Sequence, residues 1–170
     1  LACVLASEIR KKKLQEYLLR LSYQDQLTGI RNNTSYIRML NQLLEHPVPV
    51  GVAFADLNGL KYLNDTYGHE YGDQALRHLA EVSMEYFAKD QLYRVSGDEF
   101  VIICPEVQEE VFIRQAQLLK ERLKQEEQGL AAFGYLWNDG TTAADRLLHG
   151  AERLMYQEKQ QHYRDSTRRV

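Results

Sequence analysis

The chain has 170 residues, of which 44% are hydrophobic and 26% are charged, and its net charge at neutral pH is −3. This length suits one folded domain with an additional segment, and the composition is ordinary for a globular protein. The slightly negative charge provides no overall attraction for nucleic acid or an anionic membrane, so any phosphate-binding site must be local. We therefore expect no nucleic-acid partner and no direct membrane contact.

The two cysteines, Cys3 and Cys104, are too far apart in sequence to form a metal or redox motif. We expect Cys104 to be a buried thiol and the protein to be cytoplasmic. No apolar run approaches the roughly 20 residues that span a bilayer, and no signal peptide is recognisable. Because the sequence does not begin with Met, we expect it to be a fragment of a longer protein.

The first 22 residues are predicted to form a connector helix. Leu14, Tyr17, Leu18 and Leu21 follow the spacing of one helix face. Such an amphipathic helix would pair with a copy of itself or pack on an upstream domain. Turn-forming residues then interrupt the pattern before the main domain, expected over residues 23–164, with a polar tail over 165–170.

Within the main domain, helices and strands are predicted to mix along the chain. Helices are expected over 34–46, 59–67, 71–87, 107–125 and 143–163, and strands over 50–57, 92–104 (a hairpin) and 130–137. This order favours an α/β (α+β) sandwich, with a central, mainly antiparallel sheet flanked by helices.

The predicted hairpin turns at Ser96-Gly97 and is followed at once by Asp98 and Glu99. Adjacent strand residues point to opposite faces, so one carboxylate would occupy a position that strands usually fill with apolar side chains. A buried carboxylate needs a metal or a cationic partner. The alternative is a surface hairpin whose first residues happen to be acidic.

Asp56 ends the most apolar predicted strand, and Asp56-Leu57-Asn58-Gly59 does not continue as a calcium-binding loop. If that strand lies beside the hairpin, Asp56 converges with Asp98 or Glu99. Carboxylates brought together in this way repel one another unless a hard divalent cation lies between them. The spacing therefore indicates a nucleotide-associated Mg²⁺ site, with Mn²⁺ as a substitute.

Asn64 and Asp73 offer an amide and a carboxylate on either side of the break at Gly68-His69. These groups suit the hydrogen-bonding edge of guanine, although both side chains could instead cap helices. Lys61 and Lys159 are candidate phosphate contacts, and the alternative for each is an ordinary solvated lysine.

Together these residues resemble the GGDEF domains, a bacterial signalling family. The motifs that carry the resemblance occur in order and cover roughly residues 21–164: Asp25-Gln26-Leu27-Thr28-Gly29, Asp56-Leu57-Asn58 with Lys61 and Asn64-Asp65, Gly68-His69 with Gly72-Asp73, Arg94 with Ser96-Gly97-Asp98-Glu99-Phe100, and Tyr156 with Lys159. The resemblance implies a fold like the palm of nucleotide cyclases and polymerases. It also implies diguanylate cyclase activity, in which two GTP molecules condense to cyclic di-GMP and release two pyrophosphates.

The resemblance also implies a role for each residue. Asp56, Asp98, Glu99 and the backbone carbonyl of Leu57 would bind Mg²⁺, and Glu99 could instead help to activate the 3′-hydroxyl. Asn64 and Asp73 would bind guanine, and Gly97 would let the substrate approach the turn. Ser96 would lie beside the nucleotide, and the phosphates would contact Lys61, Lys159 and Arg164. Catalysis would require a homodimer with one GTP in each domain.

The sequence departs from the family pattern at several positions. Ser96 replaces the first Gly of the signature, Asn58 replaces an Asp, and the expected Gly-Arg pair of the last motif is His162-Tyr163. An expected Arg is Asn33, so Arg31 is predicted to pair with Asp25 instead. These departures support an alternative function, a catalytically weak or inactive domain that binds GTP as a regulatory module.

Two further expectations concern regulation. The family's product-inhibition motif, Arg-x-x-Asp, corresponds here to Phe87-Ala88-Lys89-Asp90, which lacks the Arg. We therefore expect no feedback inhibition through that motif. Residues 1–10 resemble the closing helix of GAF-type sensory domains, so an upstream sensory domain is the expected partner in the full-length chain.

Overall fold

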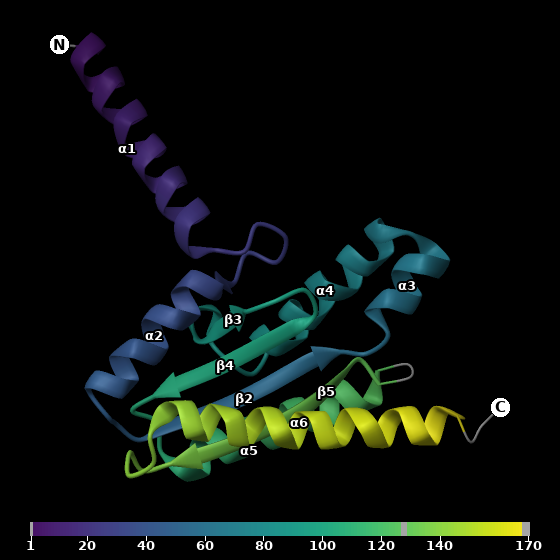
Figure 1. The fold of residues 1–170 in the computed structure, drawn as a ribbon. Helices are drawn as coiled ribbons and strands as arrows, with labels where there is room; N and C mark the ends of the chain where they lie inside the picture. Colours follow the sequence, from purple (N-terminus) through teal and green to yellow (C-terminus); the bar gives the residue numbers. More distant parts are fainter. Residues whose placement is uncertain (1, 127–128, 168–170) are drawn as a thin grey trace.

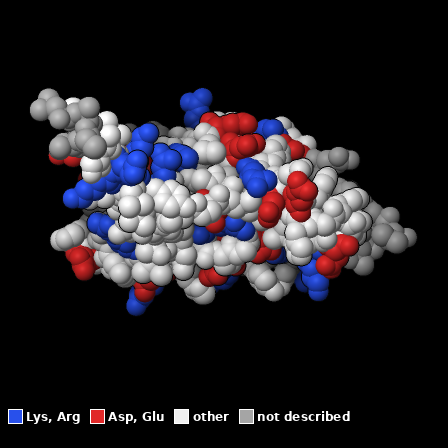
Figure 2. All heavy atoms as spheres, turned by 90° about the horizontal axis from the view of Figure 1, so that it is seen from above, with Lys and Arg blue, Asp and Glu red and all other residues white. Residues whose placement is uncertain are grey.

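The structure is a computed structural model that describes residues 2–126 and 129–167 of the chain. Helix α1 (Ala2–Tyr23) extends away from the rest of the molecule (Figure 1). Its apolar side chains are exposed: Leu5, Ile9, Leu14, Tyr17, Leu18, Leu19 and Leu21. Figure 2 shows that Lys and Arg side chains gather at the end of the molecule that carries this helix. The predicted helix is confirmed, and its apolar residues have no cover from the rest of the described chain.

The sheet has five strands in the order β1-β3-β4-β2-β5. Their bounds are Arg31–Asn32 for β1, Val50–Leu57 for β2, Leu92–Arg94 for β3, Glu99–Pro105 for β4 and Ala131–Asn138 for β5. The β1–β3 pair is parallel, and the other pairs are antiparallel. The predicted fold class, an α/β sandwich with a mainly antiparallel sheet, is confirmed. Strand β1 was not predicted because two residues are too short to show a pattern.

Helices cover both faces of the sheet. Contacts in the two hydrophobic clusters place α4 (His69–Met84) and α5 (Glu109–Gln125) on one face and α2 (Asn33–Glu45) and α6 (Ala144–Thr167) on the other. Every residue of β2 is buried, which explains why its sequence is an almost unbroken apolar run. A carboxylate in this strand must therefore have a specific partner.

Helix α6 packs closely against β5 because Gly134 has no side chain. A Cβ atom at Gly134 would lie 2.2 Å from the backbone nitrogen of Met155 and 2.3 Å from the carbonyl oxygen of Ala151. Helix α6 therefore rests directly on the sheet at this point, and the C-terminal half of the helix passes the end of β2 (Figure 1).

The remaining elements connect these layers. Helix α3 (Leu60–Tyr67) follows β2, and the short 3₁₀ helix η1 (Lys89–Gln91) precedes β3. Helix α6 continues to Thr167, beyond the predicted end at residue 163, and residues 168–170 of the predicted tail lie outside the described residues. No helix of the described chain is both long enough and apolar enough to cross a membrane.

Cys104 is 1% exposed, as predicted. Burial, with a smaller contribution from the negative charge of Asp90, raises the pKa of its thiol to about 12. The thiolate is therefore scarce at neutral pH, and this cysteine is a packing residue rather than a reactive one.

Candidate active site

The carboxylates predicted to converge lie at one end of the sheet. Strands β2 and β4 are antiparallel, and their register places Asp56 opposite Glu99. The backbone N–H of Leu57 donates to the carbonyl oxygen of Asp98 at 3.1 Å, which joins the end of β2 to the turn before β4. Asp98 itself lies in the turn, whereas Glu99 is the first residue of β4, and the negative charges of both act on Asp56.

Asp56 is 5% exposed and has a cationic partner. The Nζ of Lys159, on α6, lies 2.5 Å from Oδ1 of Asp56. Burial raises the pKa of the Asp56 carboxyl, the negative charges of Asp98 and Glu99 raise it further, and Lys159 opposes this shift without cancelling it. The site therefore concentrates negative charge that a single lysine does not fully compensate.

The turn between β3 and β4 contains Val95, Ser96, Gly97 and Asp98, and one of its own side chains engages Glu99. The Ser96 hydroxyl donates to Oε2 of Glu99 at 2.6 Å. The Glu99 N–H bonds to the carbonyl of Ser96 at 3.3 Å, and the Val95 N–H bonds to the carbonyl of Glu99 at 3.0 Å. The Ser96 hydroxyl thus contacts a carboxylate that is predicted from the sequence to be catalytic.

The donor set suits a hard cation, although within the described residues no group of three or more His, Cys, Asp or Glu side chains is arranged to hold a metal ion. The oxygens of Asp56, Asp98 and Glu99 and the Leu57 carbonyl are the ligand type that Mg²⁺ prefers. The Lys159 ammonium already supplies a positive charge at Asp56. A cation bound at Asp56 would therefore share this carboxylate with Lys159, whose Nζ contacts Oδ1.

The two predicted guanine contacts lie at the corner between α3 and α4. Gly72 is buried there, and a Cβ atom on it would lie 2.0 Å from Oδ1 of Asn64. The Asn64 side chain therefore lies against the α4 backbone, one residue from Asp73. The Gly68 N–H bonds to the carbonyl of Asn64 at 2.9 Å and closes the corner. Gly72 makes room for the amide, a role that the sequence motif alone did not reveal.

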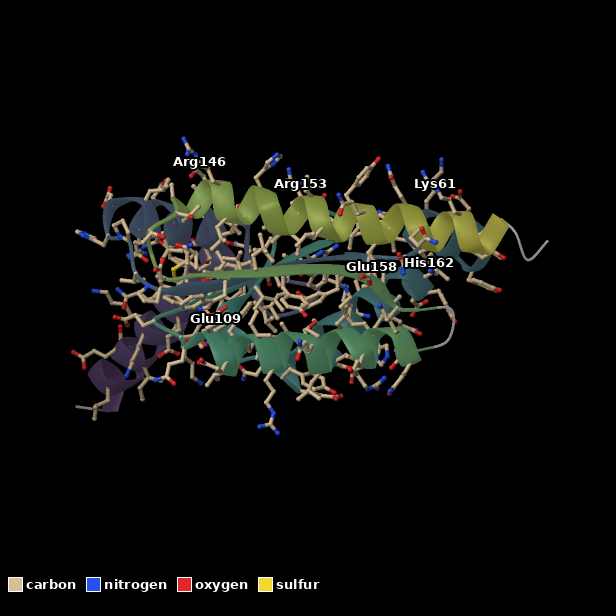
Figure 3. All side chains as sticks on the ribbon, turned by 90° about the horizontal axis from the view of Figure 1, so that it is seen from below. Lys61, Glu109, Arg146, Arg153, Glu158 and His162 are labelled. Atoms are coloured by element: carbon tan, nitrogen blue, oxygen red, sulfur yellow. The ribbon has the colours of Figure 1, made fainter. Side chains whose placement is uncertain are left out.

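The remaining predicted phosphate contacts lie at the surface. Lys61 is exposed on α3, and Arg164 is exposed on the last turn of α6. Figure 3 shows Glu158 and His162 on the sheet-facing side of α6, whereas Arg146 and Arg153 point away from the sheet. The side chain of Tyr163 lies outside the described residues.

Asn58 helps to hold the loop after β2. Its Nδ2 donates to the carbonyl of Gly129 at 3.0 Å, and its backbone N–H donates to the carbonyl of Leu130 at 3.0 Å. The amide therefore joins this loop to the segment that leads into β5.

The predicted pairing of Asp25 with Arg31 is wrong. Asp25 bonds instead to Arg94, whose Nη1 lies 3.2 Å from Oδ1 and 3.3 Å from Oδ2. Arg31 lies in β1, whose pairing with β3 leaves Arg94 at the end of the neighbouring strand. The sequence prediction failed because it considered distance along the chain and not this strand pairing, which brings Arg94, the last residue before the turn, near Asp25.

Comparison with known proteins assigns the family. The family model described as "Diguanylate cyclase, GGDEF domain" matches residues 22–165. The chain therefore belongs to the GGDEF diguanylate cyclase family.

The relatives include proteins named as diguanylate cyclases and a protein named as a cyclic di-GMP phosphodiesterase. The chain is 30% identical over 185 residues to diguanylate cyclase DgcP of Escherichia coli, a match covering 93% of this chain and 52% of DgcP. It is 31% identical over 117 residues to the E. coli cyclic di-GMP phosphodiesterase PdeR, covering 67% of this chain and 18% of PdeR. The match to E. coli DgcN, at 27% identity, covers 91% of this chain and 41% of DgcN. The chain spans between about a fifth and a half of these relatives.

Solved structures support the fold. The coiled coil and GGDEF domain of DgcB from Caulobacter crescentus superposes with a TM-score of 0.76 at 20% identity, over 94% of this chain and 92% of that one. The GGDEF domain of FimX from Pseudomonas aeruginosa gives 0.72 at 22% identity, over 82% and 95%. At these identities the likeness concerns the fold alone.

Proposed function

We propose that this domain is a diguanylate cyclase that condenses two GTP molecules to cyclic di-GMP. The observation that carries the proposal is the buried Asp56, which faces Glu99 across the β2–β4 pair and lies beside Asp98 and Lys159. A partly buried cluster of charges at the ends of two neighbouring inner strands is typical of a functional site rather than of a packing arrangement. Membership of the GGDEF family supports the same activity.

The proposed reaction joins two nucleotides by two equivalent phosphoryl transfers. In each, the 3′-oxygen of one GTP attacks the α-phosphorus of the other, and the bond from that phosphorus to the oxygen of the β-phosphate breaks. One pyrophosphate leaves at each step, and the 3′-hydroxyl proton passes to a base, a role that suits Glu99. Bound Mg²⁺, held by Asp56, Asp98, Glu99 and the Leu57 carbonyl, would neutralise phosphate charge.

The remaining residues would bind and orient the nucleotide. Asn64 and Asp73 offer an acceptor and a carboxylate to guanine, while Lys61, Lys159 and Arg164 provide positive charge for the phosphates. Ser96 and Gly97 would border the nucleotide at the turn. Because each domain would hold one GTP, catalysis needs two domains, and the exposed apolar side chains of α1 suit a helix that pairs with its copy.

The test is to supply GTP and Mg²⁺ to the purified chain and to measure both products. The proposal predicts cyclic di-GMP with two pyrophosphates released for each molecule formed. Pyrophosphate release without a cyclic dinucleotide, or neither product, would contradict it.

The second candidate is a domain that binds GTP without converting it. The hydrogen bond from Ser96 to Glu99 favours this reading, because it engages a carboxylate that the reaction would need. GTP binding measured in the absence of any product would support this function over the first.

Replacing Gly72 with Ala is expected to weaken GTP binding roughly tenfold or more while leaving the domain folded. The added Cβ would lie 2.0 Å from the Asn64 amide oxygen, so the amide must leave its position. Equilibrium titration with GTP checks this. Asn64→Ala is the matched variant, because it removes the same contact without crowding the helix. Unchanged GTP affinity in both variants would show that Asn64 does not bind guanine.

Cyclic di-GMP is expected to cause no feedback inhibition through the segment before the turn. Phe87 occupies the position of the motif's Arg, is 3% exposed, and packs on Phe112 with ring centroids 5.9 Å apart. Asp90 lines a cavity of about 440 Å³ together with Arg20 and Arg31, but the motif's own Arg position is filled by the buried Phe87. Calorimetric titration of cyclic di-GMP into the wild type and Asp90→Asn checks this. Tight binding that the substitution abolishes would refute the expectation.

A further inference from the structure

The side chain of Arg94 connects two segments far apart in the sequence. Its Nε and Nη2 donate to the carbonyl oxygen of Gly97 at 3.0 and 2.7 Å, and its Nη1 faces both carboxylate oxygens of Asp25 at 3.2 and 3.3 Å. The side chains of Arg94 and Asp25 are 15% and 22% exposed. The rigid guanidinium therefore holds the turn with one edge and Asp25 with another.

Asp25 is itself fixed by its loop. Oδ1 accepts from the backbone N–H of Thr28 at 2.9 Å and from its hydroxyl at 2.7 Å. The backbone of Asp25 bonds to Ile30 at 2.9 Å and to Gly29 at 2.8 Å. Burial alone would raise the pKa of Asp25, but the Thr28 hydrogen bonds and the charge of Arg94 outweigh it and hold the pKa below its usual value. Asp25 thus presents a fixed negative charge two residues after the end of α1.

The hydrogen bonds within the turn join Val95, Ser96 and Glu99, whereas the bonds to the Gly97 carbonyl come from Arg94. Ser96 and Gly97 are exposed, and the Glu99 N–H reaches the Ser96 carbonyl only at 3.3 Å. The Gly97 carbonyl belongs to the peptide that leads into Asp98. Two charge-assisted hydrogen bonds to that oxygen fix the direction of this peptide and therefore the starting point of the Asp98 side chain.

We propose that Asp25 is a positioning residue for the turn that carries Asp98 and Glu99, acting through Arg94. The proposal rests on the proposed cyclase function for its effect on catalysis. By this arrangement, the segment that joins α1 to the domain controls the order of the catalytic turn, and Arg94 transmits the constraint. No contact between Asp25 and the nucleotide is required.

Asp25→Asn tests this with little change in shape. The amide oxygen can still accept from Thr28, but the group facing Arg94 loses its charge and one acceptor becomes a donor. Arg94→Lys is the second variant, because a single ammonium cannot hold Asp25 and bond the Gly97 carbonyl from two nitrogens. Glu126→Gln is the control, because it breaks a partly buried ion pair with Arg122 on α5, away from the turn.

Two measurements on the full chain decide the question. The first is hydrogen exchange at the amides of Leu57 and Glu99, which bond to Asp98 and Ser96, with Ile103 in the middle of β4 as the internal reference. Both test variants should speed exchange at the first two amides about tenfold relative to Ile103, and Glu126→Gln should not. The second is steady-state kinetics, in which kcat should fall roughly 10-fold or more with KM for GTP within about twofold.

The exchange measurement and the kinetic measurement distinguish a failure of this proposal from a failure of the proposed cyclase function. If the wild type makes no cyclic di-GMP, the cyclase proposal fails, and the exchange arm still decides the positioning role. Exchange at Leu57 and Glu99 that stays unchanged, or changes only in parallel with Ile103, would overturn the inference. A fall in kcat of the same size in Glu126→Gln would also overturn it, because that loss would follow from stability alone.

Discussion

Replacing Asp98 with Asn is expected to reduce the rate of cyclic di-GMP formation by about 100-fold or more. The substitution removes one negative charge from the cluster at the end of β2, where the charge of Asp98 helps to raise the pKa of Asp56. It leaves the backbone carbonyl that accepts from the Leu57 N–H at 3.1 Å, so the turn should remain in place. Product formation measured by chromatography, together with a urea unfolding curve, checks both expectations.

Asp145→Asn is the matched control for this experiment. Asp145 is an exposed Asp in the first turn of α6, far along that helix from Lys159, and the same change in charge there should leave the rate unaltered. If Asp98→Asn still makes product at a rate near that of the wild type, Asp98 does not take part in metal binding and the assigned site is wrong.

Replacing Gly134 with Ala is expected to lower the free energy of unfolding by about 3 kcal/mol or more. The new Cβ would meet two backbone atoms of α6 at 2.2 and 2.3 Å, and backbone atoms cannot move aside as a side-chain end can. Helix α6 would have to shift away from β5 and would carry Lys159 with it. Urea unfolding monitored by circular dichroism measures the loss directly.

Gly150→Ala, on α6 itself, distinguishes collision with a backbone from the general effect of adding a methyl group. A Cβ there would meet only the Cδ1 of Leu136, at 2.7 Å, and a helical Gly to Ala change is intrinsically favourable by about 1 kcal/mol. We expect its stability to lie within about 1 kcal/mol of the wild type. Equal losses in the two variants would contradict the close-packing argument.

Much of the fold follows from pattern. The apolar run of β2 predicts a strand covered on both faces, and all of its residues are buried. The spacing of apolar residues predicts every long helix to within a few residues of its observed bounds. Strand β1 escaped prediction, because two residues that pair with β3 carry no periodic signal.

The position of the candidate site could be predicted from the sequence, but the hydrogen bonds among its side chains could not. The sequence predicts that Asp56 converges with Asp98 or Glu99 if the two strands are neighbours, and the pairing of β2 with β4 places Asp56 opposite Glu99. The hydrogen bond between Ser96 and Glu99 could not be read from the sequence, because it depends on how the four-residue turn closes. The serine at position 96 therefore adds a hydrogen bond to Glu99 that a glycine could not make.

Arg94 shows a further limit of sequence reasoning. Its partner, Asp25, lies 69 residues earlier, and the β1–β3 pairing brings the two together along with the loop that bonds Asp25 to Ile30. Gly72 is similar, since the motif marks it as important but only the packing of Asn64 explains why no side chain fits there. Long-range contacts of this kind need the topology before they can be inferred.

The most direct test of the central claim is product formation by the domain held as a dimer, for example by a coiled coil fused ahead of α1. With GTP and Mg²⁺ in excess, we predict cyclic di-GMP and two pyrophosphates for each molecule formed, and a loss of both products in Asp98→Asn. Bound GTP with no cyclic di-GMP, even at high protein concentration, would contradict the claim and identify the domain as a nucleotide-binding module.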